Sequence, residues 1–347
     1  MIREAIVHVA SGGKLNEEEA AGVMEEIMTG MATPSQLGAF LTALRLRPGA
    51  ETVEEIAGLA RVMRDKALQV QLNEQAAARA MDTCGTGGDG TGTLNISTGA
   101  GIIAAAAGAV IAKHGNRSAT SQCGSADVLE ALGARIDLGP EAVAHSVQEV
   151  GFGFMFAQTY HPAMKHVGPT RREIGIRTVF NILGPLTNPA RTQFQVLGVA
   201  DSSLMRKMGE VLIHLGCQHA LIIHSEDGLD ECSISAPTRV CEVRQGQDMR
   251  EYTITPEEVG LQRSADLSGV KGGDPSYNAS TLRELLSSYI DTPATHILCM
   301  NAGAALLAND AVSSWQEGVR LASATLREGK AREKLQDVIA YSQTVGR

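Results

Sequence analysis

Residues 82–98 read DTCGTGGDGTGTLNIST and place five glycines in the eight positions that begin at Gly85. Glycine lets the backbone turn at positive φ and approach a ligand closely, because it has no Cβ. Ser97 and Thr98 follow as natural N-cap residues for a helix predicted over 99–107. A helix start carries unpaired N–H groups and a partial positive charge, which favour phosphate. The stretch therefore predicts a phosphate or pyrophosphate site on this loop.

The loop also contains Gly-x-Gly-x-x-Gly at 85–90, the spacing of a dinucleotide-binding fingerprint. That fingerprint needs an acidic residue about 20 positions further on to hold the ribose hydroxyls. Residues 103–111 are all apolar or glycine. An ATP-binding P-loop needs a lysine before Ser or Thr after its last glycine, and the sequence has none there. A flexible surface turn remains as the alternative, but the helix start that follows favours anion binding.

The composition limits the classes of function. A chain of 347 residues with 44% hydrophobic content fits a globular protein of two domains. With 30 basic and 39 acidic residues, its bulk charge does not favour nucleic acid or a membrane surface, although a local basic pocket for phosphates is compatible. No apolar run is long enough to span a bilayer, and the start lacks a signal-peptide core. The six cysteines form no Cys-x-x-Cys pair. We expect a cytoplasmic protein with reduced thiols.

The first 70 residues or so predict short helices with clear boundaries. Asn16 can cap a helix that ends near Gly30, and Thr33-Pro34 places a cap before a proline at the first helical position. Thr52 begins a capping box, and apolar residues follow it at helical spacing. This part predicts a small helical domain.

From about residue 80 the pattern changes to apolar strands that alternate with helices. We predict strands at 151–157, 194–200, 219–224 and 296–300, helices at 140–150, 202–215, 281–289 and 302–308, and a β-hairpin over 240–254. Such alternation indicates an α/β sheet covered by helices. Ligands in such folds bind in loops beyond the carboxyl ends of strands, and the glycine loop lies at one such place.

A second polar stretch, KHGNRSATS at 113–121, follows an apolar strand and precedes a helix that Ser125 could cap. Its cations Lys113 and Arg117, with four small side-chain donors, suit a multiply charged phosphate ligand. A solvated polar loop is the alternative reading of this stretch alone. Its place one helix after the glycine loop favours the phosphate interpretation.

Two further stretches carry charged side chains. Asp230 and Glu231 are hard oxygen ligands that would suit Mg²⁺ held jointly with substrate phosphates; an acidic turn is the alternative. Arg171, Arg172 and Arg177 could present a fork to a substrate carboxylate, or they could form a surface charge cluster. The prolines around these arginines favour a rigid, buried crossing between segments.

Taken in order, these blocks resemble the anthranilate phosphoribosyltransferase family. The motifs that carry the resemblance are GTGGD (85–89), NIST (95–98), KHGNRS (113–118), GPLTNP (184–189) and the pair 230–231. The resemblance implies an α/β fold of the nucleoside phosphorylase-like type. A small α-helical domain (1–72, joined by a mid-chain segment near 165–192) would lie beside a large α/β domain (73–347) whose central sheet is flanked by helices. It further implies a cleft between the domains and a homodimer formed through the helical domain.

The resemblance also implies a reaction: anthranilate and phosphoribosyl pyrophosphate give N-(5-phosphoribosyl)anthranilate and pyrophosphate, a step of tryptophan biosynthesis. Carried over by motif, the phosphoribosyl pyrophosphate site would comprise Gly85, Gly88, Asp89, Thr93, Asn95, Ile96, Ser97, Thr98, Lys113, His114, Gly115, Asn116, Arg117, Ser118, Ala119, Thr120, Ser121 and Ser125.

The same resemblance implies the other two binding sets. The residues facing anthranilate would be Gly85, His114, Asn116, Arg171 and Pro185, with Arg171 preferred over Arg172, and the cofactor Mg²⁺ would be held by Ser97, Asp230 and Glu231. His114 is a candidate orienting residue. No catalytic base is assigned, because the amine of anthranilate is already unprotonated at neutral pH.

Two alternatives share the implied fold. A pyrimidine nucleoside phosphorylase would use phosphate as the nucleophile, but its Lys-x-Ser and Gly-Gly-Thr arrangement does not occur at the phosphate site. A nucleic-acid-binding paralogue with a decayed site is disfavoured by the net charge of −9 and by the intact glycine loop.

Overall fold

The computed structural model describes residues 1–118 and 121–345. Its N-terminal helices are α1 (Ile2–Ala10), α2 (Glu17–Met28), α3 (Pro34–Leu46) and α4 (Val53–Lys66). Asn16, Thr33 and Thr52 cap α2, α3 and α4 as predicted, and each side chain accepts a hydrogen bond from the backbone N–H three residues later. The predicted helical part is therefore confirmed, and its boundaries follow from local capping chemistry.

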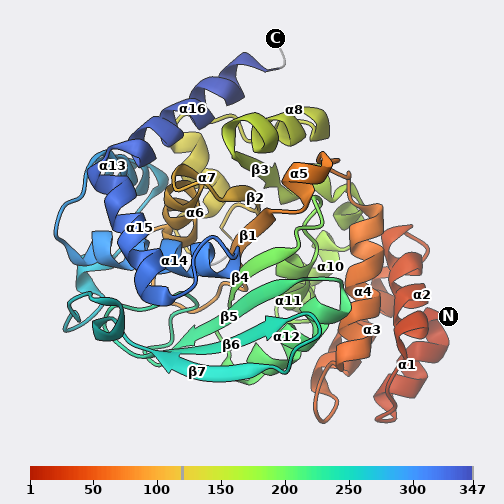
Figure 1. Ribbon diagram of the computed structural model, residues 1–347. Coiled ribbons are helices and arrows are strands. Elements are labelled where there is room, and N and C mark those ends of the chain that lie inside the picture. Colours follow the sequence, from red (N-terminus) through yellow and green to blue (C-terminus); the bar gives the residue numbers. More distant parts are fainter. Residues whose placement is uncertain (119–120, 346–347) are drawn as a thin grey trace.

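A mid-chain segment returns to these helices. It contains α9 (Ala157–Tyr160), α10 (Gly168–Ile174) and α11 (Phe180–Leu183). α10 packs against α3, and α11 packs against α4. Val167, Phe180 and Leu183 share one apolar cluster with the N-terminal helices. Segments far apart in the sequence therefore pack together in one helical part, with α1 to α4 at the right of Figure 1 and α10 and α11 between them and the sheet.

The remaining described residues form a sheet of seven strands with helices around it (Figure 1). The strands are β1 (Ala80–Gly85), β2 (Val110–Gly115), β3 (Phe152–Phe156), β4 (Phe194–Gly198), β5 (His219–Ser225), β6 (Thr238–Arg244) and β7 (Arg250–Ile254). Their order is β3-β2-β1-β4-β5-β6-β7. The first five are parallel, while β6 and β7 are antiparallel and form the predicted hairpin.

Helices cover both faces of this sheet. They are α5 (Glu74–Ala77), α6 (Ile96–Ala106), α7 (Ser125–Ala131), α8 (Pro140–His145), α12 (Met205–His214), α13 (Pro275–Ser287), α14 (Pro293–Ala308), α15 (Trp315–Arg327) and α16 (Lys330–Thr344). In β5, Leu221 and Ile223 join the apolar cluster of α14, whereas Ala220 and Ile222 join that of α12. This alternation is what a strand buried on both faces requires.

The strand predicted at 296–300 is wrong, because these residues lie inside α14. Every residue of α14 from Ala294 to Ala308 is buried. A short apolar run can belong to a buried strand or to a helix buried all round, so its periodicity does not distinguish the two. Thr292 and Pro293, a cap followed by proline, mark the true helix start. The other predicted strands are confirmed to within a few residues, and the helix expected at 281–289 begins earlier, as α13, behind the cap Asp274.

Two predicted caps are also wrong. α6 begins at Ile96 with Asn95 in the cap position, so Ser97 and Thr98 lie in its first turn. α7 begins at Ser125, and Gly124 precedes it. In α7 the Asp127 carboxylate accepts the Gly124 N–H at 2.9 Å. A side chain at the third helical position thus satisfies the N–H of the residue that precedes the helix, and no side chain at the cap position accepts an N–H from inside it.

The strand order places a reversal beside β1. From β1 the chain builds β2 and β3 on one side of the sheet, and β4 and β5 on the other. In open α/β sheets such a reversal leaves room for a ligand outside the carboxyl ends of the strands. The glycine loop begins at that end of β1, directly beside the end of β4.

Candidate active site

The ends of β1 and β4 bring the acidic pair to the glycine loop. Gly85 pairs with Gly198 across the two strands. A Cβ on Gly198 would overlap the Asp230 carbonyl oxygen, and a Cβ on Gly85 would lie 2.6 Å from Asp230 Oδ2. The Gly87 N–H donates to Asp230 Oδ2 at 2.9 Å. Glycine is required at both strand ends because Asp230 packs directly on the backbone there.

The second carboxylate reaches the start of α6. Glu231 Oε1 accepts the Ser97 N–H at 3.1 Å, one of the N–H groups that a helix start leaves unpaired. Thr83 Oγ1 donates to the Ser97 carbonyl at 3.2 Å and holds the first turn against β1. The structure thus brings Ser97 together with the pair Asp230 and Glu231, although 134 positions separate Ser97 from Glu231 in the sequence.

Lys113 lies beneath this arrangement. It stands on β2 rather than after it, and it is 2% exposed. Its Nζ donates to the Thr83 carbonyl and to Ser97 Oγ, the latter at 3.3 Å. The cation is thus held at the junction of β1, β2 and α6, directly below the loop.

Asp82 anchors the same strand ends from the interior. Its Oδ1 accepts the His114 N–H at 3.2 Å, and its Oδ2 accepts Asn188 Nδ2 at 2.7 Å. Burial raises the pKa of Asp82 to about 6, against the opposing effect of the Lys113 charge. Asn188 also donates to the Ala112 carbonyl at 2.8 Å. The polar part of the 184–189 motif therefore fixes the position of β2.

Asp230 and Glu231 have unusual electrostatics. Removal from water raises the pKa of Asp230, and the Asp89 charge adds to this rise. Removal from water also raises the pKa of Glu231, and Asp230 adds to it. Like charges in a poorly hydrated place disfavour the ionised form. Their hard oxygens suit a divalent cation, and a cation would relieve this repulsion.

The residues that the structure describes contain no group of three or more His, Cys, Asp or Glu side chains arranged to hold a metal ion. A cation at Asp230 and Glu231 would therefore take its remaining oxygens from Ser97, from substrate or from water. Mg²⁺ is commonly held in this way, by one or two carboxylates together with substrate phosphates. The donor set fits that ion.

The loop after β2 is more structured than its composition suggests. Arg117 is paired with Asp127 and Glu130, each at 2.8 Å, and lies 5.5 Å from the centre of the Phe156 ring. Ser118 Oγ accepts the Ser121 N–H at 2.7 Å. Ala119 and Thr120, which were also predicted to bind the phosphate ligand, lie outside the described residues. Asn116 Oδ1 accepts the Arg117 N–H at 2.8 Å, and the Ser125 hydroxyl donates to the Asn116 carbonyl at 3.3 Å.

A histidine pair lies beside the 184–189 motif. The rings of His114 and His161 are 5.0 Å apart, and both are buried. Burial lowers the pKa of His114 to about 3, with His161 adding to the shift, and lowers the pKa of His161 to about 4. Neither Nε2 has a hydrogen-bond partner among the described residues. Both rings are therefore neutral at physiological pH, and each leaves a buried nitrogen available to a ligand.

The two neighbouring arginines of α10 differ. Arg171 is partly buried, and its guanidinium lies 5.4 Å from the centre of the Phe180 ring. Burial lowers the pKa of Arg171. Arg172 is exposed. A guanidinium stacked on an aromatic ring is pre-organised for a carboxylate, which favours Arg171 for that role.

The remaining predicted residues lie around the loop. Asp89 Oδ2 accepts the Thr91 hydroxyl at 2.6 Å. Thr93 pairs with Lys271 in an isolated bridge, and Thr98 Oγ1 is buried without a partner among the described residues. Gly88 has a φ of +79°. Pro185 is buried, and its carbonyl accepts a hydrogen bond from Gln195 Nε2 at 2.8 Å. Ile96 is buried beneath the helix start, and Gly115 ends β2.

Sequence reasoning missed several residues that hold the site. Asp82, described above, is one of them. In addition, Asn278 Nδ2 donates to Asn95 Oδ1 at 2.9 Å, and Lys271 Nζ donates to the Thr91 carbonyl at 2.7 Å. The Gly272 N–H donates to the Gly92 carbonyl at 2.9 Å. The segment KGGD at 271–274, another pair of glycines before a helix cap, was the available signal.

Comparison with known proteins gives consistent matches. Residues 77–332 match the glycosyl transferase family, a/b domain, and residues 3–67 match the glycosyl transferase family, helical bundle domain. The anthranilate phosphoribosyltransferase of Chloroflexus aggregans is 50% identical over 99% of this chain and 98% of its own length. The enzyme of the same name from a Roseiflexus species is 51% identical over the same shares.

Solved structures agree with these matches. Anthranilate phosphoribosyltransferase from Thermus thermophilus superposes with a TM-score of 0.91 at 43% identity, covering 98% of this chain and 99% of that one. The Saccharomyces cerevisiae enzyme in complex with PRPP and Mg gives a TM-score of 0.90 at 27% identity, covering 99% of this chain and 98% of that one. The similarity thus extends over both the helical and the α/β parts.

Proposed function

The chain belongs to the anthranilate phosphoribosyltransferase family, and we propose that it transfers the 5-phosphoribosyl group of phosphoribosyl pyrophosphate to the amine of anthranilate. The products are N-(5-phosphoribosyl)anthranilate and pyrophosphate, and the step belongs to tryptophan biosynthesis. The observation that carries this proposal is a pair of hydrogen bonds: the Gly87 N–H donates to Asp230, and the Ser97 N–H donates to Glu231. It joins a carboxylate pair to a phosphate-binding loop.

The relatives support this transferase over the two alternatives. Many full-length relatives at about half identity carry the transferase name. A phosphorylase using free phosphate would have no need of a carboxylate pair at the loop. A decayed paralogue would have no reason to keep Asp230 and Glu231 in contact with the glycine loop and α6.

Ser97, Asp230 and Glu231 would hold Mg²⁺, as the donor set allows. When bound, this cofactor would neutralise charge that grows on the departing pyrophosphate. Lys113 lies within reach of Ser97 and adds a fixed positive charge below the loop. The Gly87 and Ser97 N–H groups hold Asp230 and Glu231 in place, so the charged groups of the site are positioned before the reaction begins.

We assign the anthranilate side to Gly85, His114, Asn116, Arg171 and Pro185. Arg171 would bind the carboxylate through its guanidinium fork. His114 is neutral, so its free Nε2 can orient the aromatic amine without carrying charge. A pKa of about 3 makes His114 too weak a base to retain a proton at neutral pH.

The reaction is a displacement at the anomeric carbon of the ribose. The amine nitrogen forms the new bond to that carbon, while the bond to pyrophosphate breaks and the leaving group takes the electron pair. The amine then loses one proton to water or to the leaving group. Holding the amine beside the anomeric carbon supplies proximity, and the cationic loop stabilises the leaving group.

The quaternary and cellular setting is also part of the proposal. We propose a homodimer formed through the small helical domain (1–72, with 165–192), beside a large domain of 73–347. Exposed apolar side chains on the helical domain support this, because Val7 is 65% exposed, Met31 72% and Leu46 74%. No helix in the described ranges is long and apolar enough to cross a membrane. We place the enzyme in the cytoplasm, where its substrates would be made.

The first experiment follows the fluorescence of anthranilate with purified protein, phosphoribosyl pyrophosphate and Mg²⁺, with and without EDTA. Fluorescence loss that needs both phosphoribosyl pyrophosphate and Mg²⁺ is expected. Absence of loss with folded protein would overturn the proposed function and direct attention to phosphorolysis of pyrimidine nucleosides.

A further inference from the structure

Arg177 contacts the glycine loop from the helical side of the molecule. It follows Gly175, which ends α10 at a φ of +70°. Its Nη2 donates to the Gly87 carbonyl at 3.2 Å, across 90 positions of sequence. Its Nη1 occupies the place where a Cβ on Gly88 would be. The guanidinium therefore rests directly on the backbone of the loop.

The opposite side of the same loop rests on a carboxylate. The Gly87 N–H donates to Asp230 at 2.9 Å, while the Gly87 carbonyl accepts from Arg177. Gly87 and Gly88 have φ of +63° and +79°, conformations that side chains rarely adopt. One residue thus joins a cation of the helical layer to an anion of the sheet layer. The loop is shaped to lie between them.

Two of the cations near the loop are already committed to other groups, whereas Lys271 and Arg177 are each held by a backbone carbonyl. Lys113 is buried and already donates to Thr83 and Ser97, and Arg117 is paired with Asp127 and Glu130. Arg177 is exposed, and within the described part of the chain its hydrogen-bond partner is a neutral carbonyl. A guanidinium held only by a carbonyl keeps its charge and most of its N–H groups for an incoming anion.

We propose that Arg177 is a diphosphate-binding residue of this enzyme. It extends the cationic lining of the phosphoribosyl pyrophosphate site from the helical side, opposite Asp230. This inference rests on the proposed function, because it takes the diphosphate of that substrate as the ligand. Arg177 binds the leaving group through its fork, whereas Arg171 on the same segment serves the anthranilate carboxylate.

The test compares Arg177→Ala with Arg172→Ala in the full-length chain. Arg172 is a matched control, because it is an exposed arginine of the same segment. Inorganic pyrophosphate with Mg²⁺ is titrated calorimetrically into each protein, and KM values for both substrates are measured by anthranilate fluorescence. Arg177→Ala should weaken pyrophosphate binding and raise the KM for phosphoribosyl pyrophosphate by about tenfold. Arg172→Ala should change either quantity less than about twofold.

Arg177→Lys should fall between wild type and Arg177→Ala, because it keeps the charge and loses the fork. A difference of less than about threefold between Arg177→Ala and Arg172→Ala overturns the proposal. Tighter pyrophosphate binding by Arg177→Ala also overturns it, because Arg177 would then block the loop. Failure of the proposed function is distinct, since the wild-type chain itself would then consume no anthranilate.

Discussion

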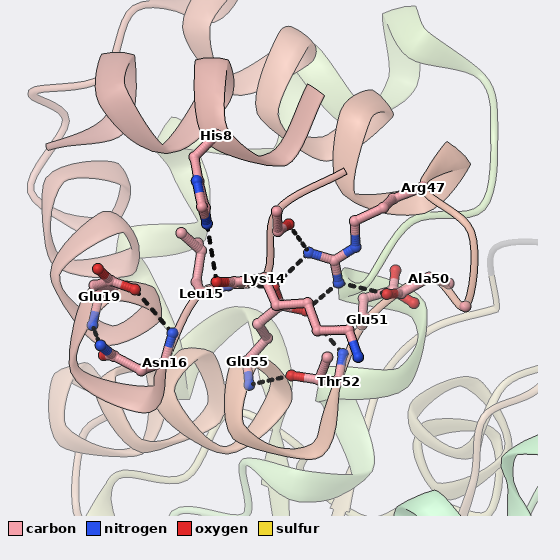
Figure 2. A network of polar contacts seen from close by, with 12 residues as sticks. His8, Lys14, Leu15, Asn16, Glu19, Arg47, Ala50, Glu51, Thr52 and Glu55 are labelled. Carbon is pink, nitrogen blue, oxygen red and sulfur yellow. Dashed lines mark hydrogen bonds and ion pairs between the residues drawn. The ribbon is translucent and has the colours of Figure 1, made fainter. Parts of the chain in front are cut away.

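Glu55 and Glu231 are both acidic residues set against backbone N–H groups, yet their surroundings shift their acidity in opposite directions. Figure 2 shows Glu55 paired with Arg47 in the helical bundle. Arg47 Nη2 lies 2.5 Å from Glu55 Oε2, and both side chains are at most 1% exposed. Burial alone raises the pKa of Glu55, but Arg47 and the N–H groups of Leu15 and Thr52 outweigh it and hold the pKa below its ordinary value. The pKa of Glu231 is raised.

The difference lies in where the compensating charge comes from. Glu55 has its cation within the chain, and its oxygens accept Leu15 N–H at 2.9 Å and Thr52 N–H at 2.8 Å. For Glu231 the largest charge effect comes from an anion, Asp230, and the opposing effects of Lys113 and the Ser97 N–H do not offset it together with burial. A buried carboxylate whose charge is balanced within the chain stabilises the fold. Carboxylates whose charge is not balanced attract a cation, which is typical of a binding site. The charge network of the bundle is complete within the chain, whereas under the proposed function Mg²⁺ and substrate would supply the charge that balances Asp230 and Glu231.

The largest expected effect comes from breaking the completed network. Arg47→Met removes the partner of a fully buried carboxylate and should lower the free energy of unfolding by about 3–5 kcal/mol. Urea unfolding followed by circular dichroism measures this loss. The double variant Arg47→Met/Glu55→Leu should recover part of it, because no unpaired charge remains. A single variant as stable as wild type would contradict the structural role of this pair.

The uncompensated pair should respond in activity instead of stability. Asp230→Asn/Glu231→Gln should lower kcat/KM by at least about a hundredfold, equivalent to about 2.7 kcal/mol, because the site would lose its hold on Mg²⁺. The rate is measured across a Mg²⁺ titration. Glu226→Gln, at an exposed acid of the adjacent turn, is the control. An unchanged Mg²⁺ dependence in the double variant would refute the assignment.

Arg171 tests the proposed anthranilate side of the site. Arg171→Ala should raise the KM for anthranilate by about tenfold, and more than it raises the KM for phosphoribosyl pyrophosphate. The reason is the loss of a forked contact to the anthranilate carboxylate. Steady-state kinetics with each substrate varied in turn give both values. The reverse order of effects would remove the carboxylate role from Arg171.

The smallest effect is a dependence of bundle stability on pH. A carboxyl whose folded pKa is depressed stabilises the fold above its unfolded pKa, about 4.5 for Glu55. That contribution is lost as the pH falls from there through the folded pKa, by up to about 1.4 kcal/mol for each pH unit. The stability difference between wild type and Glu55→Gln should therefore be constant from about pH 7 to 5 and shrink below 4.5. Urea unfolding at each pH measures it, and a constant difference down to about pH 3 would contradict the pairing.

Much of this architecture could be predicted because its causes are local. Asn16, Thr33 and Thr52 mark helix starts through contacts three residues away, and the motifs at 85–98 and 113–121 mark the site through their composition. α14 was misassigned in part because a helix buried on all sides loses its periodic signal.

Contacts across the chain could not be predicted in the same way. Arg177 reaches Gly87 across 90 positions, and Asn278 reaches Asn95 across 183. Such contacts depend on how the layers pack, which no local pattern encodes. Arg117 shows the converse. The composition of the 113–121 stretch predicted that Arg117 binds phosphate, but in the fold its guanidinium is paired with Asp127 and Glu130.

The glycines that end β1 and β4 have a consequence for protein engineering. Because Asp230 packs against the main chain at Gly85 and Gly198, the position of this carboxylate is set by the spacing of two adjacent strands. Grafting this chemistry into another scaffold would require transplanting both strand termini together with the 230–231 turn. A library that randomises residues 230–231 alone can vary the side chains offered to a ligand. A library that randomises Gly198 would place a Cβ against the Asp230 backbone and displace this turn.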